Sequence, residues 1–437
     1  MQEIKCKNQS VKIENGVIVE VAESSLDSAK NAESTTFCHS ERSEESQKKN
    51  NRDSSVATLP QNDNLIEFAE SSVVIPQFID LNVFPKNKSL SRNSILSLAK
   101  KAKAGGVGII ALNSALNPAI DNEMAIEFIK NISSEVAILP LIASNAVDSA
   151  PFSHDSVQDS ASNFKEGKIC DIAILNALGG VGINLNSAKS ANTIDKVAKY
   201  AKMLDIPLFI NANDNLGGVI NYGQISAELG IPARNPLSEI KEVAKMLEVA
   251  IFYGIKVVFS AISEIRSLEL INQAKKHNPQ IFAEVSAHHL LLNDEACRGY
   301  NTAAKINPPL KDKGTQERLL RALQDGEIDL LTSLQCAVFN SKKDLPFGSA
   351  EYGIDAISHY FALLFSGLVE RKVISLERLF EVCAENQAKI LGLNCGKIER
   401  GKEARLMVVD LDSVIEVNDA FSPYNGAKLQ GQILRFV

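Results

Sequence analysis

FIDLNVF, residues 78–84, is a short apolar run that contains Asp80 and ends in two spaced side chains, Asn82 and Phe84. Such a run is typical of a buried strand whose alternate side chains point to the same side. Two His residues at these spaced positions would be able to hold a divalent cation. Asn is a weak ligand for zinc, and Phe is not a ligand at all. The stretch therefore predicts a strand that is placed for metal chemistry but lacks the side chains for it.

Downstream of this stretch, helix-length amphipathic segments alternate with short apolar runs. SILSLAKKAKAGG precedes VGIIAL, and NTIDKVAKYAKMLD precedes IPLFINA. Near-continuous apolar strands between helices indicate a parallel sheet that is covered on both faces. Because five or more such units follow in series, we predict an α/β fold that closes into a (β/α)₈ TIM-type barrel over residues 75–396.

Both ends of the chain have the pattern of a small β domain. VKIENGVIVEVAE holds an Asn15-Gly16 turn between two β-type runs, and ARLMVVDLD and GAKLQGQILRFV alternate near the C-terminus. We predict that residues 1–74 and 397–437 together form this composite domain. Residues 23–64 are rich in Ser, Glu, Asn and Lys, and we expect them to form a flexible insertion.

The composition of the 437-residue chain excludes several classes of protein. The net charge of -7 gives no electrostatic reason to expect a nucleic-acid partner, since phosphate binding normally shows as a basic face. Apolar runs such as LLFSGLV are far shorter than the roughly 20 residues that span a bilayer. The first residues, MQEIKCKNQS, lack the apolar core of a secretory signal. We therefore expect a cytoplasmic protein without a membrane segment.

The strand ends of the predicted barrel offer no set of zinc ligands. They carry amide, hydroxyl and small side chains, at Asn211, Asn213, Ser260, Ala261, Thr332 and Ser333. The adjacent His288 and His289 point in different directions, so we expect them to have a structural role. Cys336 follows a strand, but no His is recognisable as the base that would activate it. Motif chemistry alone therefore predicts no catalytic residue.

Several longer blocks follow one another in a familiar order. They include VVIPQFIDLNVF, GQISAELGIPA, AEVSAHHLLLNDEACRGYNTAAKINPPL, ALQDGEIDLLTS and GKIERGKEARLMVVDLD. Together they resemble the dihydroorotase branch of the amidohydrolase superfamily over almost the whole chain. The resemblance implies a barrel that opens and closes the cyclic amide ring of dihydroorotate in pyrimidine synthesis. It also implies one or two zinc ions at the barrel mouth.

The same resemblance implies where the metal ligands should stand, and this chain has none of them. The first-strand His-x-His falls on Asn82 and Phe84, the next two His ligands on Asn211 and Ala261, and the catalytic Asp on Leu334. A bridging carboxylate or carboxylated Lys is expected near residues 176–177, which are Asn and Ala. We expect the zinc of the family to be absent.

Two substrate-binding positions of the family are partly preserved. Lys86 matches the Arg that pairs with the substrate carboxylate, and it keeps the charge but loses the bidentate fork. Asn307 matches the Asn of the NPPL block. We treat both as vestigial substrate-binding residues.

The resemblance and the missing ligands together predict a noncatalytic dihydroorotase-like protein of pyrimidine biosynthesis. Noncatalytic members of this branch are associated with aspartate transcarbamoylase. We therefore expect a structural or regulatory subunit that assembles with the aspartate transcarbamoylase catalytic subunit, as a homodimer or in a larger hetero-oligomer. One alternative is a cyclic amide hydrolase with an altered site, in which Asp214, His288, Cys336 and Lys86 converge. Another is a ligand-sensing module that binds through Lys86 and Asn307.

Overall fold

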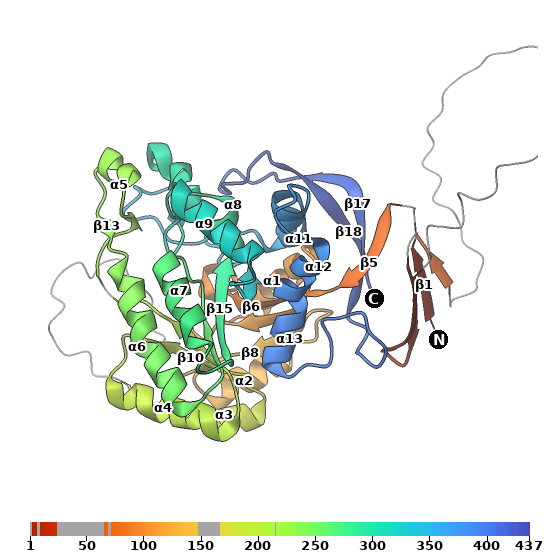
Figure 1. Ribbon diagram of the computed structural model, residues 1–437, viewed down its shortest axis with the longest axis horizontal. Helices are drawn as coiled ribbons and strands as arrows, with labels where there is room; N and C mark the ends of the chain where they lie inside the picture. The colour runs from red at the N-terminus through yellow and green to blue at the C-terminus, as the bar shows by residue number, and fades with distance from the viewer. Residues whose placement is uncertain (1, 7–8, 24–64, 69–70, 147–166, 215) are drawn as a thin grey trace, which may run out of the picture.

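The structure is a computed structural model (Figure 1). It describes residues 2–6, 9–23, 65–68, 71–146, 167–214 and 216–437. Apart from Glu23, the insertion expected at residues 23–64 lies outside these described residues.

Eight strand positions form a parallel barrel at the centre of the molecule. In chain order they are β6 (Phe78–Val83), β7 (Val107–Leu112), β8 (Ala137–Pro140) continued by β9 (Ile142–Ala143), β10 (Ile183–Asn186), β11 (Leu208–Asn211), β14 (Val257–Phe259), β15 (Ile281–Ser286) and β16 (Leu330–Thr332). Parallel ladders join neighbours in the orders β6-β7-β8 and β9-β10-β11-β14-β15-β16. Phe84 N donates to Gln335 O at 2.8 Å, which links the last strand position to the first. The predicted (β/α)₈ barrel is confirmed.

Helices follow the strands and cover the outside of the barrel (Figure 1). They are α1 (Arg92–Ala104), α2 (Glu123–Lys130), α3 (Ile172–Leu178), α4 (Ala191–Leu204), α6 (Leu237–Tyr253), α7 (Ile265–Ala274), α8 (Ala287–Leu291), α9 (Lys313–Gln324), α11 (Tyr360–Leu364), α12 (Leu376–Phe380) and α13 (Asn386–Leu391). In α4, Ser190 caps the first turn, and Ile194, Val197 and Ala201 are buried at helical spacing. All residues of β6 and β7 are buried, as expected for strands between two apolar layers. Within the described part of the chain, no helix is long and apolar enough to cross a membrane.

A small β domain contains strands from both ends of the chain. One sheet has the order β3-β2-β1-β4, from β1 (Gln2–Cys6), β2 (Gln9–Glu14), β3 (Val17–Glu23) and β4 (Leu65–Glu67). The second has the order β18-β17-β5, from β5 (Ser72–Pro76), β17 (Leu406–Glu416) and β18 (Lys428–Phe436). Buried Ile4 and Val11 of the first sheet pack with Val74 and Leu406 of the second.

Gln77 marks the passage from the β domain to the barrel. β5 ends at Pro76 and β6 begins at Phe78, so the β domain extends slightly beyond the expected limit at residue 74. The buried Gln77 side chain donates through Nε2 to Leu406 O at 2.8 Å. The first strand of the barrel is thereby fixed to a strand from the C-terminal part of the chain.

Candidate ligand site at the barrel mouth

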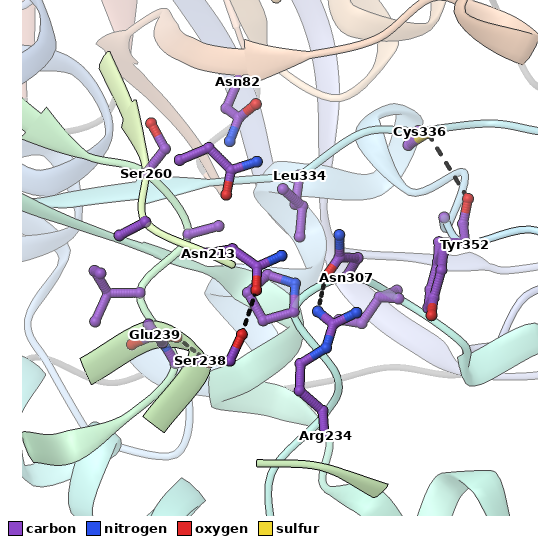
Figure 2. Close-up of a pocket in the computed structure, with 18 of the residues that line it drawn as sticks. Asn82, Asn213, Arg234, Ser238, Glu239, Ser260, Asn307, Leu334, Cys336 and Tyr352 are labelled. Carbon is purple, nitrogen blue, oxygen red and sulfur yellow. Dashed lines mark hydrogen bonds between the residues drawn. The ribbon is translucent and has the colours of Figure 1, made fainter. Parts of the chain in front are cut away.

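A cavity of about 140 Å³ opens at the carboxyl ends of the barrel strands (Figure 2). Residues from most of the strand ends line it, among them Asn82, Phe84, Asn113, Asn184, Asn211, Ser260, Ala261, Leu334 and Cys336. Connecting segments add a second wall, which includes Arg234, Glu239, Asn307, Lys311 and Tyr352. The cavity lies where ligands bind in barrels of this type.

Five of the positions to which the resemblance assigns metal ligands meet at this cavity. They are Asn82, Phe84, Asn211, Ala261 and Leu334. Their side chains bring two amides, an aromatic ring, a methyl group and an isobutyl group. Zinc in proteins is bound by His, Cys and carboxylate side chains, so this set does not fit the metal. Throughout the described ranges, no three His, Cys, Asp or Glu residues are grouped to hold a metal ion.

Asn176 and Ala177, near which the resemblance implies a bridging ligand, do not line the cavity. Asn176 lies on α3, outside the barrel strands, and its Nδ2 donates to Gly180 O at 2.8 Å. The fourth strand position is β10, and its Asn184 lines the cavity. Asn184 Oδ1 accepts from Ser114 N at 2.8 Å, which fixes its side chain. The strand end at this position also carries an amide rather than a carboxylate.

A buried carboxyl group, that of Glu284 on β15, contacts two of the cavity residues. Its Oε1 accepts from Asn82 Nδ2 and from Ala261 N, both at 3.2 Å. Burial, with a smaller contribution from Asp80, raises the pKa of Glu284 to about 8, against the lowering effect of these hydrogen bonds. At neutral pH Glu284 is therefore mostly protonated. Sequence reasoning missed Glu284 because it is a single polar residue within the apolar strand IFAEVS.

Asp80 of the FIDLNVF stretch supports the barrel and does not line the cavity. It is fully buried on β6. Its Oδ1 accepts from Thr332 Oγ1 at 2.6 Å and its Oδ2 from Ser333 N at 2.9 Å, so it ties β6 to the end of β16. Burial raises the pKa of Asp80, and the hydrogen bonds from Ser333 and Thr332 oppose this shift.

The acidic groups on the second wall are already paired. Lys311 Nζ lies 2.5 Å from Glu264 Oε1 in a largely buried ion pair. Glu239, on the first turn of α6, accepts from Ser263 Oγ at 2.6 Å and from Glu264 N at 2.9 Å. Burial raises the pKa of Glu239, while the nearby Lys311 lowers it. These carboxyl groups hold the start of α7 in place.

The structure brings one of the two expected substrate-binding residues to the cavity. Asn307 lines it, and its Oδ1 accepts a hydrogen bond from Arg234 Nη1 (Figure 2). Lys86 is exposed and is not among the lining residues, and its ammonium lies 5.1 Å from the ring centroid of Phe339. Lys88, two residues further on, does line the cavity. Sequence reasoning therefore found Asn307 but missed Arg234 and Lys88.

His288 and His289 are both buried and hydrogen-bonded, in agreement with the expected structural role. His288 Nδ1 lies 2.8 Å from Tyr424 Oη, and His289 Nδ1 lies 2.7 Å from Ser286 Oγ. Burial lowers the pKa of each imidazole to about 3, so both are neutral at physiological pH. Neither His lines the cavity.

The four residues of the altered-hydrolase alternative do not converge. Asp214 forms an ion pair with Lys241 of α6 and does not line the cavity. His288 and Lys86 also lie outside the lining, as described above. Cys336 does line it, but burial raises the pKa of its thiol, which opposes formation of a nucleophilic thiolate.

Similarity to known proteins extends over most of the chain. No family model matches it. A probable dihydroorotase-like protein of Helicobacter pylori is 30% identical over 364 residues, which cover 83% of this chain and 83% of that protein. A dihydroorotase of Thermoanaerobacter sp. is 27% identical over 384 residues, 85% of this chain and 86% of that one. Among solved structures, an L-hydantoinase (dihydropyrimidinase) from Arthrobacter aurescens has a TM-score of 0.76 and 16% identity, covering 100% of this chain and 95% of its own. At 16% identity, this structural similarity supports the fold and no statement about activity.

Proposed function

Because the chain belongs to the dihydroorotase-like amidohydrolases, we propose that it is a noncatalytic member of that family. One observation carries this proposal. Five of the positions to which the family resemblance gives metal ligands meet at a single cavity, and none of the five carries a side chain that binds zinc well.

The chemistry of the family explains why these substitutions matter. A zinc ion would lower the pKa of a bound water to about 7 and polarise the amide carbonyl of the substrate. The buried Glu284 is mostly protonated at neutral pH and is hydrogen-bonded to Asn82, so it is poorly suited to act as a general base. The imidazoles of His288 and His289 lie away from the cavity. The described residues thus supply no evident replacement for the metal.

The proposed role is that of a structural or regulatory subunit in pyrimidine biosynthesis. A barrel keeps its outer helices and its β domain whether or not its mouth retains catalytic residues. The resemblance to noncatalytic members supports the aspartate transcarbamoylase catalytic subunit as the partner. On this proposal the chain acts in the cytoplasm, as a homodimer or within a larger hetero-oligomer.

Zinc analysis combined with dihydroorotate turnover tests the noncatalytic proposal. We expect the purified chain to hold much less than one zinc per chain. We also expect no hydrolysis or formation of dihydroorotate, with or without added zinc. A zinc-containing dihydroorotase assayed in parallel is the positive control. Turnover by the chain at a rate comparable to that of the control would contradict the proposal.

A cyclic amide hydrolase with an altered site is the second candidate. It is favoured by the polar cavity that persists at the barrel mouth, with amide side chains from several strands. Turnover of dihydroorotate that survives removal of metal by a chelator would favour this candidate. Turnover that appears only with added zinc would instead indicate a metal site that the described residues do not form.

A further inference from the structure

Arg234 places a cation at the cavity without an acidic partner. The residue ends the short strand β13 (Ala233–Arg234) and is partly buried. Among the described residues, its guanidinium makes one hydrogen bond, to Asn307 Oδ1, and no ion pair. Burial lowers the pKa of Arg234, because the charged form has lost part of its hydration. A guanidinium has five N–H donors, so most of its hydrogen-bonding capacity remains unused.

The nearby acidic groups are engaged with other residues. Asp214 is paired with Lys241, and Glu239 accepts hydrogen bonds from Ser263 and Glu264. Neither forms an ion pair with Arg234, although both lie near enough to raise its pKa. A carboxylate from elsewhere would therefore complete the hydrogen bonding of the guanidinium.

Asn307 adds donors of its own beside Arg234. Because a guanidinium can only donate, the Asn307 atom that faces it must be the amide oxygen. The Nδ2 group of Asn307 is then left as a donor, and Figure 2 shows the two side chains meeting in the cavity. Together the two residues present several N–H donors, and the amide oxygen of Asn307 already accepts from Arg234. This combination suits an anion.

The backbone around Arg234 is tightly packed, which fixes its position. β13 pairs with β12 (Ile220–Asn221), and Val219 N donates to Pro232 O at 2.9 Å. Gly218 has a φ of +84°, and a Cβ there would come within 2.2 Å of Arg234 N. This close approach requires glycine. The backbone from which the guanidinium extends is thereby ordered before a ligand arrives, which lowers the entropy cost of binding.

We propose that Arg234 and Asn307 bind the carboxylate of a small organic acid at the barrel mouth. The planar guanidinium matches a carboxylate through paired N–H donors. The amide side chains of Asn82, Asn113 and Asn211 can meet carbonyl or N–H groups elsewhere on the same ligand. This inference deepens the proposed function, on which it rests, because it assigns a ligand class to a mouth that does not perform the family's hydrolysis.

Calorimetric titration of the full-length chain tests this site with three probes. Orotate and uracil share a ring and differ by one carboxylate, and inorganic phosphate is a small anion without that ring. We expect orotate to bind at least about tenfold more tightly than uracil or phosphate, as a charged hydrogen-bond pair would give. In Arg234→Met, the affinity for orotate should fall by at least about tenfold, to the level of uracil. Arg266→Met, at an exposed arginine on α7, is the matched control and should leave the affinity unchanged.

A second variant keeps the test valid if Arg234→Met folds poorly. Asn307→Asp is nearly isosteric, and its carboxylate would neutralise Arg234 and repel the ligand, so orotate affinity should also fall. Melting temperatures measured alongside report whether each variant is folded. Unchanged orotate affinity in folded Arg234→Met or Asn307→Asp would overturn the proposal.

Three other outcomes would also contradict the site. They are equal affinity for orotate and uracil, phosphate binding as tight as orotate binding, and no heat of binding with any probe. Failure here leaves the noncatalytic proposal untouched, because that proposal depends on turnover. Conversely, dihydroorotate turnover would refute the noncatalytic proposal while the effect of Arg234→Met on binding could still be measured.

Discussion

Ala261 and Leu334 at the cavity have backbone conformations that their side chains disfavour. Their φ angles are +53° and +46°, in the left-handed region. For an L-residue other than Gly this conformation costs about 1–2 kcal/mol, and for a bulky residue such as Leu it is uncommon. The resemblance assigns metal ligands to both positions. Strained backbone is found at functional sites more often than elsewhere, and here it accompanies side chains that bind no metal.

The strain at Ala261 predicts an unusual tolerance of glycine. In Ala261→Gly, relief of the left-handed conformation should offset the lost methyl burial and the added chain entropy. The free energy of unfolding should therefore stay within about 0.5 kcal/mol of the wild-type value. Ala283→Gly, at a fully buried position of β15, should lower it by at least about 1 kcal/mol. Urea denaturation measures the free energy of unfolding of both variants. An equal decrease in the two variants would show that the backbone at Ala261 is not strained.

The buried Glu284 predicts a dependence of stability on pH. Its pKa is about 8 in the folded protein against an ordinary value of 4.5. Folding therefore favours the protonated form, and the stability that this gives is lost as pH rises towards 8. The buried His288 and His289 oppose this slope near pH 6.5, because the unfolded chain still binds protons on them there. Lys305 and Lys343 oppose it near pH 8, because burial lowers the pKa of each to about 8. The contribution of Glu284 alone is a fall in the free energy of unfolding between pH 6.5 and 8, by up to about 1.4 kcal/mol per pH unit.

The variant Glu284→Gln separates the contribution of Glu284 to the pH dependence of stability from that of the other titrating groups. Glutamine has nearly the shape of a protonated Glu284 side chain and does not titrate. Between pH 6.5 and 8 the slope of the variant should therefore be higher than the wild-type slope, by up to about 1.4 kcal/mol per pH unit. Glu317→Gln, at an exposed position of α9, is the control and should keep the wild-type slope. The same slope in Glu284→Gln as in the wild type would show that Glu284 does not carry the raised pKa.

At the scale of elements, the sequence predicted the barrel well and its connections less well. Apolar runs between amphipathic helices identified most strands, and their ends located Asn211 and Ala261 at the cavity. The pattern did not reveal β10, because its four residues follow the turn at Gly179 and Gly180. It also could not reveal Arg234, since no periodicity predicts how a segment such as Gly218 to Arg234 packs back towards the mouth.

Lys305 acts at this scale by holding one wall of the cavity. Its buried ammonium donates to the carbonyls of Phe347 and Ala350, each at 2.6 Å, and of Gly348 at 3.1 Å. The Tyr352 ring centroid lies 4.6 Å from the same ammonium. The lysine thus supplies the hydrogen bonds that regular secondary structure would give to these three backbone carbonyls. The segment that carries them leads to the cavity residues Tyr352 and Gly353.

Lys305→Met should therefore be strongly destabilising. It leaves three backbone carbonyls without their donor, and we expect the free energy of unfolding to fall by at least about 3 kcal/mol. Lys342→Met, which removes an exposed lysine 3.4 Å from Glu351, should cost less than about 1 kcal/mol. Urea denaturation of both variants measures the difference. A Lys305 variant as stable as the Lys342 variant would show that the lysine does not hold the wall.

At the scale of the whole molecule, the barrel and the β domain form a scaffold around a mouth where the described residues group no three His, Cys, Asp or Glu side chains to hold a metal ion. The barrel and the two-sheet β domain are joined through Gln77 and through the buried cluster in which Met407 of β17 is grouped with Phe78 and Phe361. None of these contacts depends on the cavity residues. We therefore expect the chain to fold without metal and to keep the outer surfaces through which a barrel protein meets a partner.

We propose that the chain serves assembly instead of catalysis. Size-exclusion chromatography with light scattering, on the chain mixed with the aspartate transcarbamoylase catalytic subunit of the same cell, can show whether the two assemble. Transcarbamoylase activity is followed across the peak. We predict a stoichiometric species larger than either component, with raised or restored transcarbamoylase activity. Two separate peaks with unchanged activity would contradict the claim.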